Sequence, residues 1–327
     1  MIRHFCLSGG SDFAILTLSY PYNFTEFLRK LWQDWKGGRR HLDEKREDLG
    51  PLLVEQFRQQ MNNLSAAIQL LTPVVREKAG PQYDPYLAIL HQSLYRLIRM
   101  VGNLEYLELP EGELPLREGT LDLAGLCREL GEQVSPLTAL AGIRFSYEEE
   151  IGSLLTHGDG AQLRRLLLNL IANAVRAAGE GGESGLRLAR RGGRAVLTVW
   201  DNGPGFLPET DERELLQRPG SLGLGLKVAR RIAALHGGSI VFEQREERGS
   251  RAIVSLPLRP PEPGELLKTP RMGFDGSGGF SDTLIELAGV LPYRAFFPED
   301  VEYYSADGAR RRPCAVCISG RKGRERI

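Results

Sequence analysis

The chain has 327 residues, of which 42% are hydrophobic and 26% are charged, and its 42 Lys and Arg balance 42 Asp and Glu. This composition excludes global disorder, and zero net charge excludes a uniformly basic nucleic-acid binder. Four cysteines are too few for a disulfide framework, and no apolar run is long enough to span a bilayer. The length suggests about two domains. Because the N-terminus lacks the apolar stretch of a signal peptide, we expect a soluble cytoplasmic protein.

Residues 1–45 form a short N-terminal segment whose role the sequence does not indicate. The alternating run Phe13–Tyr20 is typical of a strand, and the aromatic stretch Phe24–Trp35 has the pattern of an amphipathic helix. Since a segment this short buries little core by itself, we expect it to pack on another part of the protein.

Residues 46–109 carry two helix-period patterns separated by Gly80-Pro81 and Pro85. In each pattern the apolar residues recur every three or four positions, which places them on one stripe of a helix. The first stripe is Leu53, Phe57, Met61, Leu64, Ile68, Leu71 and Val75, and the second is Leu87, Leu90, Leu94, Leu97, Val101 and Leu104. The pattern therefore predicts an antiparallel two-helix hairpin.

Such a hairpin buries little apolar surface in isolation. A homodimeric four-helix bundle through 46–109 is one solution, and we favour it. A hairpin packed on the neighbouring domain of the same chain is the other.

Residues 110–119 are rich in Pro, Gly and Glu and predict a linker, after which residues 120–258 predict an α/β layer with two or three helices over one sheet face. Prolines from 257 to 263 end this domain, and 259–327 form a C-terminal extension. The predicted elements are helices Leu163–Ala178 and Leu226–Leu235, and strands Leu186–Leu188, Ala195–Trp200, Ser239–Glu243 and Arg251–Leu256.

The motif DNGPGF, at residues 201–206, directly follows the apolar strand that ends at Trp200. The carboxylate of Asp201 is only an acceptor, so it suits an exocyclic amine such as adenine N6. Gly203 and Gly205 allow the backbone to approach a flat ligand closely. Taken alone, the same motif also predicts a simple hairpin turn.

A glycine-rich stretch, GSLGLGL at 220–226, runs into the second predicted helix. Gly223, Leu224 and Gly225 there leave backbone N–H groups at a helix N-terminus, a site that favours anions. Lys227 in the first helical turn is well placed for phosphate.

The earlier predicted helix carries Asn169 and Asn173 on one face, among leucines. An amide oxygen can ligate Mg²⁺, and Arg176, three residues beyond Asn173, can reach a phosphate on the same face. The alternative is that the two amides only hydrogen-bond to neighbouring loops.

In this order the three motifs resemble the N, G1 and G2 boxes of the GHKL superfamily of ATP-binding domains, and within it those of sensor histidine kinases. The matching stretches are NLIANA at 169–174, DNGPGF at 201–206 and GLGL at 223–226. The resemblance covers about 120–258 and implies a Bergerat-type α/β sandwich. The expected fold class is therefore α+β, with a two-helix dimerisation hairpin followed by this ATP-binding domain.

The resemblance also implies roles for residues of the three boxes. Asn173 would be the Mg²⁺ ligand, Asn169 would help to hold the phosphates and Asp201 would bind adenine. Arg176 stands where the family usually has Lys. Asn169 stands where the gyrase, Hsp90 and MutL branch carries a Glu that activates water, so an ATP-hydrolysing clamp is disfavoured. We expect ATP and Mg²⁺ as cofactors, bound by Asn169, Asn173, Arg176, Asp201, Gly203, Gly205, Gly223, Leu224 and Gly225.

Two features depart from the family pattern. The first predicted helix reads Phe57-Arg58-Gln59-Gln60, where histidine kinases have roughly Phe-x-His-Glu, so Gln59 occupies the phosphoacceptor position. An amide nitrogen is not nucleophilic and cannot form the phosphoramidate. The lid between the G1 and G2 boxes, Leu207–Pro219, is short and lacks a Phe.

The remaining candidates are weaker. We expect His91 to be a solvated residue on the flank of the second helix. We expect His236 to end a helix that Gly237 caps. Cys314 and Cys317 lack the second ligand pair of a zinc site, and the basic run of 310–326 is typical of a solvated end. Phe280–Leu291 predicts an amphipathic helix that docks on the ATP-binding domain.

The sequence thus predicts a histidine-kinase-like signalling protein that binds Mg-ATP but does not phosphorylate itself at the usual site. A response regulator or a partner kinase is the expected partner. The first alternative is a non-catalytic ATP-binding module that regulates such a partner. A further alternative is a kinase that acts in trans on a Ser or His of another protein.

Overall fold

The structure, a computed structural model, describes residues 49–109, 116–205, 223–260 and 280–297. The chain divides into two compact units, Met1–Gly50 and Pro51–Ile327, and the first contributes only the start of one helix to the described residues. The predicted strand and helix within 1–45, the short lid and the cysteines of the tail lie outside the described residues.

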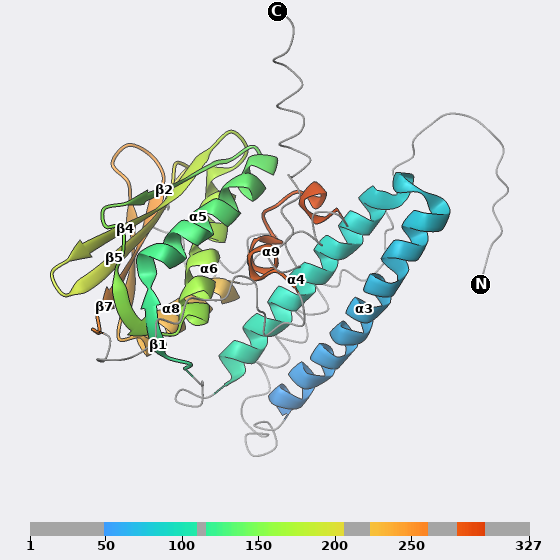
Figure 1. Cartoon of the computed structure of the whole chain (residues 1–327), viewed down its shortest axis with the longest axis horizontal. Helices are drawn as coiled ribbons and strands as arrows, with labels where there is room; N and C mark the ends of the chain where they lie inside the picture. The colour runs from blue at the N-terminus through green and yellow to red at the C-terminus, as the bar shows by residue number, and fades with distance from the viewer. Residues whose placement is uncertain (1–48, 110–115, 206–222, 261–279, 298–327) are drawn as a thin grey trace, which may run out of the picture. The chain divides into compact units, whose positions relative to one another are not determined.

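The predicted hairpin is present as two helices. α3 (Leu49–Ala79) and α4 (Asp84–Glu108) are joined by Gly80 and a 3₁₀ turn, η1 (Pro81–Tyr83). Gly80 has a φ of 83°, a value that favours glycine. Pro81 has no backbone N–H to donate to the preceding helical turn, so it cannot extend α3. The break therefore falls where the sequence predicts it (Figure 1).

His91 is buried on α4, so the expectation of a solvated flank residue is wrong. Its ring faces the other hairpin helix, where Nε2 lies 3.2 Å from Thr72 Oγ1. The Thr72 hydroxyl donates to the Ile68 carbonyl at 2.7 Å, so it accepts from His91. Burial lowers the pKa of His91, which keeps the ring neutral.

A five-stranded sheet forms the second part of the fold, in the order β2-β4-β5-β7-β6. Its only parallel pair is β2 with β4; the other neighbours are antiparallel. The strands are β2 (Arg144–Glu149), β4 (Glu183–Arg191), β5 (Arg194–Asp201), β7 (Ser250–Pro257) and β6 (Ser239–Gln244), and a separate antiparallel pair joins β1 (Gly119–Asp122) to β3 (Leu155–Gly158).

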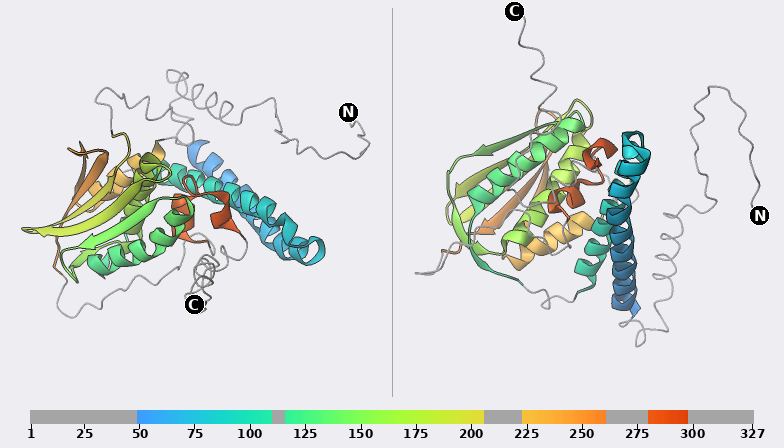
Figure 2. Two further views of the ribbon diagram at one scale, coloured as in Figure 1. Left: turned by 90° about the horizontal axis from the view of Figure 1, so that it is seen from above. Right: turned by 45° about the vertical axis from the view of Figure 1, so that its right-hand side comes forward.

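Three of the described helices cover one face of this sheet: α5 (Leu123–Leu140), α6 (Gly160–Ala178) and α8 (Leu224–Leu235) (Figures 1 and 2). The layer agrees with the predicted architecture. The sequence pattern did not identify β1, α5, β2 or β3. None of the described helices is long and apolar enough to cross a membrane.

The central helix α6 begins at a well-defined cap. The side chain of Asp159 accepts hydrogen bonds from Ala161 N and Gln162 N, at 3.0 and 3.1 Å. The leucines of α6 then form a buried stripe against the sheet. His236 ends α8 as expected: Nδ1 donates to the Ile232 carbonyl at 2.8 Å, while Nε2 accepts from Asp159 N at 3.1 Å.

The last described segment, residues 280–297, packs on both α4 and α6. It contains α9 (Asp282–Leu287), which is shorter than the predicted helix, and η2 (Tyr293–Phe296). Tyr95 of α4 contacts the rings of Phe280 and Phe296 at centroid distances of 5.3 and 5.4 Å. The predicted docking is thus present, and it includes the hairpin as well as the α/β layer.

Candidate nucleotide-binding site

Asp201 is the last residue of β5 and lies under the helices. Side chains alternate along a strand, and Ala195, Leu197 and Val199 are all buried on the helix-covered face. The same period places the Asp201 carboxylate on that face, where the residue is only 3% exposed. A carboxylate in this position must be hydrogen-bonded to offset its burial.

Protein groups already donate three hydrogen bonds to the Asp201 carboxylate. Oδ2 accepts from the Ser250 hydroxyl at 2.5 Å, and Oδ1 accepts from the backbone N–H groups of Gly203 at 2.9 Å and Ser250 at 3.3 Å. The two oxygens have about four acceptor positions, so one more donor can be accommodated. Gly203 is required here because a Cβ would lie 2.2 Å from the Ala177 carbonyl oxygen at the end of α6.

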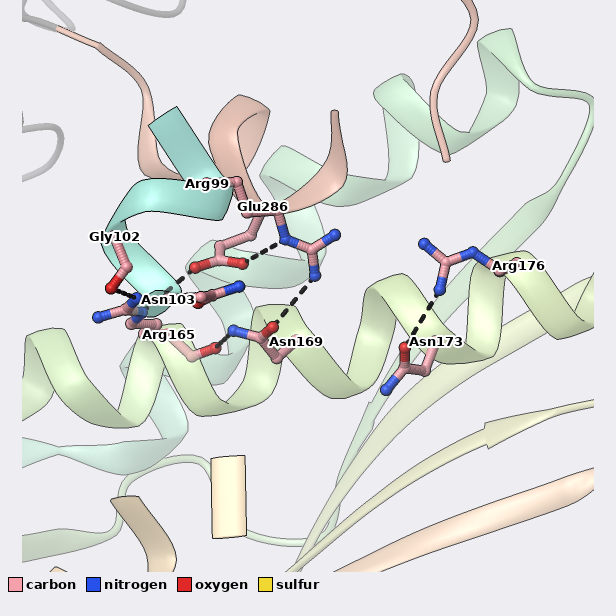
Figure 3. Close-up of polar contacts among 8 residues, drawn as sticks. All are labelled: Arg99, Gly102, Asn103, Arg165, Asn169, Asn173, Arg176 and Glu286. Atoms are coloured by element: carbon pink, nitrogen blue, oxygen red, sulfur yellow. Dashed lines mark hydrogen bonds and ion pairs between the residues drawn. The ribbon is translucent and has the colours of Figure 1, made fainter. Parts of the chain in front are cut away.

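Asn173 and Arg176 are both half-buried and lie together toward the C-terminal end of α6 (Figure 3). Arg176 Nη1 donates to Asn173 Oδ1 at 3.4 Å. Burial lowers the pKa of Arg176, and the positive charge of Arg99 on α4 lowers it further. Two neighbouring guanidinium groups in a partly desolvated place favour an anion between or beside them.

Asn169 lies one turn earlier on α6 and is fully buried. Its Oδ1 accepts from Arg99 Nη2 at 3.1 Å, and its Nδ2 donates to the Arg165 carbonyl at 2.9 Å. Gly225 at the start of α8 packs directly on this amide, because a Cβ there would lie 2.3 Å from Asn169 Oδ1. The N box and the G2 box are therefore in contact.

The α8 N-terminus begins at this contact. Gly223 is the N-cap, with a φ of 67°, and among the described residues no side chain makes a capping hydrogen bond to the helix. Its first N–H groups lie beside the face of α6 that carries the two asparagines. This arrangement is the one that attracts phosphate to helix N-termini.

The structure thus brings Asn169, Asn173 and Arg176 onto one face of α6, with Asp201 and Gly203 near its end and Gly223 to Gly225 beside its middle. Gly205 is the last described residue before the lid. The sequence analysis assigned no role to three further polar residues: Ser250, which bonds to Asp201, Arg99, which bonds to Asn169, and Glu286, which pairs with Arg99. Ser250 directly precedes the predicted strand Arg251–Leu256 and begins β7 in the structure, so its proximity to Asp201 could have been inferred from strand pairing.

A family model for histidine kinase-, DNA gyrase B- and HSP90-like ATPases matches residues 158–260. The chain carries a GHKL-family ATPase domain of the sensor histidine kinase type. The predicted fold class, a helical hairpin followed by a mixed α/β domain, is confirmed.

The relatives of the chain include sensor histidine kinases. Sensor histidine kinase RppB of Synechocystis sp. is 27% identical over 231 residues, which cover 64% of this chain and 51% of RppB. Sensor protein KdpD of Escherichia coli is 29% identical over 226 residues, which cover 66% of this chain and 25% of KdpD. The chain thus spans about half or less of the length of these relatives.

Among solved structures, full-length ShkA in complex with AMPPNP is similar with a TM-score of 0.54 and 26% identity. The similarity covers 64% of this chain and 45% of ShkA. It extends beyond the 103-residue stretch matched by the family model, since 64% of this chain is about twice that length.

Proposed function

We propose that the chain binds Mg-ATP along α6 and acts as a histidine-kinase-like signalling protein in the cytoplasm. The observation that carries this proposal is the convergence of a buried carboxylate, an amide–guanidinium pair and a helix N-terminus that begins at a glycine. Each group suits one part of the nucleotide, and all of them lie within residues 158–260.

The fit to adenine rests on Asp201. Three of its acceptor positions are filled by Ser250 and Gly203, and the remaining one suits the exocyclic amine of adenine. Guanine presents a carbonyl oxygen at the corresponding position, which a carboxylate repels. The site therefore favours adenine over guanine nucleotides.

The fit to phosphate and magnesium rests on α6 and α8. Asn173 offers an amide oxygen, a ligand that Mg²⁺ accepts together with water and phosphate oxygens. Arg176 and the α8 N-terminus supply the positive charge that balances the phosphates. Bound Mg²⁺ would neutralise phosphate charge, and Asn173 would hold it.

Asn173→Ala is expected to weaken ATP-analogue binding about 5- to 30-fold when Mg²⁺ is present and about twofold or less in EDTA, because the lost group is a metal ligand. Isothermal titration calorimetry under both conditions measures the difference. Equal losses with and without the metal would assign Asn173 a purely structural role.

We also propose that residues 46–109 form a homodimer. Three of the six residues of the predicted α3 stripe whose side chains the structure describes are exposed in the single chain: Phe57, Leu64 and Leu71. Further large apolar side chains of the hairpin are exposed as well: Leu70, Val74, Tyr86, Ile89 and Leu90. A second copy of the hairpin would bury them in a four-helix bundle.

The double variant Leu71→Arg, Leu90→Arg is expected to be monomeric, while the wild type sediments as a dimer. Each dimer loses four buried side chains worth about 1.5–3 kcal/mol apiece, so the dissociation constant should rise at least ~10⁴-fold. Val241→Arg, at a 52% exposed position on β6, is the matched control and should remain dimeric. Sedimentation velocity reads the result. A monomeric wild type, or a dimeric double variant, would contradict the proposal.

The signalling proposal depends on Gln59. It lies on α3 with an exposed side chain whose Nε2 donates to Glu55 Oε1 at 3.2 Å. It offers no nucleophile, so the chain is expected to act through a partner, of which a response regulator or a kinase is the best candidate.

Incubation with radiolabelled ATP separates the possible activities. Label on a partner protein indicates a kinase acting in trans. Binding of ATP with no label on any protein indicates a non-catalytic regulatory module. Label on a histidine of this chain would contradict the proposal that it does not phosphorylate itself.

A further inference from the structure

The segment 280–297 lies outside the matched ATPase domain, yet it contacts both the hairpin and the N-box helix (Figures 1 and 3). Gln92 of α4 donates through Nε2 to the carbonyls of Ala288 at 3.2 Å and Leu291 at 2.7 Å. Arg96, also on α4, donates through Nε to Ala288 O at 2.9 Å. These bonds attach the end of α9 to the hairpin.

Glu286 is the charged residue at the centre of this contact. It is only 5% exposed, and it forms ion pairs with Arg99 of α4 and Arg165 of α6, at 2.9 and 3.4 Å. A buried carboxylate is stable only when it is paired, so its two partners are held at fixed positions. Arg165 is held further by the Gly102 carbonyl and Asn103 Oδ1, both at 2.9 Å.

Arg99 binds two partners through two of its guanidinium nitrogens. Nε donates to Glu286, and Nη2 donates to Oδ1 of Asn169, the first asparagine of the N box. The guanidinium is planar and rigid, so a carboxylate that fixes Nε also fixes the direction in which Nη2 donates. The Asn169 amide is thereby oriented with its oxygen toward Arg99 on α4 and its nitrogen toward the Arg165 carbonyl, one turn earlier on α6.

We propose that Glu286 and Arg99 are positioning residues that preorganise Asn169 for the phosphates of ATP, so that the C-terminal segment and the hairpin together set the nucleotide affinity. This inference rests on the proposed function of the same site. The relay runs from Glu286 on α9 through Arg99 on α4 to Asn169 on α6, and it joins three parts of the fold that are distant in sequence.

The relay couples the position of α4 to nucleotide binding, and this coupling acts in both directions. A displacement of α4 moves Arg99 and releases the Asn169 amide, which weakens nucleotide binding. By linkage, a bound nucleotide that needs the oriented amide stabilises the same position of α4 and of segment 280–297. The affinity for ATP therefore depends on residues that the ATPase domain does not contain.

The test compares variants of the full chain by calorimetry with an ATP analogue and Mg²⁺. Glu286→Gln removes the charge that fixes Arg99. Arg99→Lys keeps the charge but lacks the fork that bridges two partners. Each is expected to weaken binding roughly 5- to 30-fold, the loss of one or two charge-assisted hydrogen bonds. The affinity of the double variant should be within about twofold of that of the weaker-binding single variant, because both changes break the same relay.

Thr283→Val is the matched control. Thr283 is also buried on α9, but its hydroxyl contacts Gln133 and Arg164, at 2.8 and 3.4 Å, and takes no part in the relay. Its nucleotide affinity should stay within about twofold of the wild type. A loss as large as that of Glu286→Gln would show that general packing of α9, rather than the relay, sets the affinity, and would overturn the inference.

A second readout needs no nucleotide. In the apo protein the side-chain amide protons of Asn169, assigned by their loss in Asn169→Asp, should exchange slowly in the wild type and in Thr283→Val. Exchange should be at least about tenfold faster in Glu286→Gln and Arg99→Lys. Unchanged exchange and unchanged affinity in these variants would overturn this inference alone, whereas a wild type that binds no nucleotide would overturn the proposed function as well.

Discussion

Asp201→Asn is expected to lower the affinity for ATP about 5- to 150-fold while the protein stays folded, since an unpaired or repelled buried group costs about 1–3 kcal/mol. An amide at this position offers a donor where the adenine amine also donates. The Ser250 hydroxyl, now at 2.5 Å from Oδ2, can rotate to accept from the amide, so the local structure has a substitute bond. Calorimetry with ATP and with GTP measures the effect, and the loss should be specific to ATP.

Ser250→Ala is the informative companion. It removes the hydroxyl that orients the carboxylate but leaves the negative charge and the bonds from Gly203 N and Ser250 N. We expect a smaller loss of about 2- to 10-fold, from one hydrogen bond. Affinity in Asp201→Asn equal to that of the wild type would remove Asp201 from the adenine site.

The parts of the fold that the sequence predicts are those with strong periodicity or a motif. The strand before Asp201 is a short apolar run that ends at a motif, and the stripe on α6 is rich in leucine, so the predicted bounds of both agree with the structure to within a few residues. Helix α5 was missed because Gly131 and Pro136 interrupt its pattern. The structure explains the glycine: a Cβ at Gly131 would lie 2.8 Å from the Tyr147 Cβ on β2, so the close packing of helix on strand requires it.

The residues of the site also fall into those that the sequence predicts and those that it does not. The residues that the motifs indicate are local in sequence, and the fold brings them together on α6 and its neighbours. Arg99 and Glu286 carry no such signal, because they reach Asn169 only through contacts that span 70 and more residues. The prediction that His91 is solvated is wrong for a related reason. The sequence pattern shows where His91 lies on its own helix, but its burial depends on how α3 packs against that helix.

The largest expected effect concerns phosphoryl transfer, because it is a complete absence. Incubated with ATP, the purified protein should bind nucleotide yet acquire no acid-labile, base-stable phosphate. Gln59 has no ring nitrogen to attack the γ-phosphorus, and Gln60 has no carboxylate to orient such a nitrogen. Phosphoryl transfer is catalysed mostly by positioning and charge stabilisation around a competent nucleophile, so a well-bound ATP cannot replace the missing acceptor.

The double substitution Gln59→His, Gln60→Glu tests whether only the acceptor is missing. Position 59 is exposed on α3 and its present amide makes only one hydrogen bond among those described, to Glu55, so a histidine fits there without disturbing the hairpin. If α3 and the nucleotide site keep a kinase-like relation, the variant should gain acid-labile label, whereas Gln59→Ala with Gln60→Glu should gain none. Label on a histidine of the wild-type protein would contradict the prediction. Label mapped to His91 would be especially informative, because that ring is buried against Thr72 and could be phosphorylated only if the two hairpin helices separate.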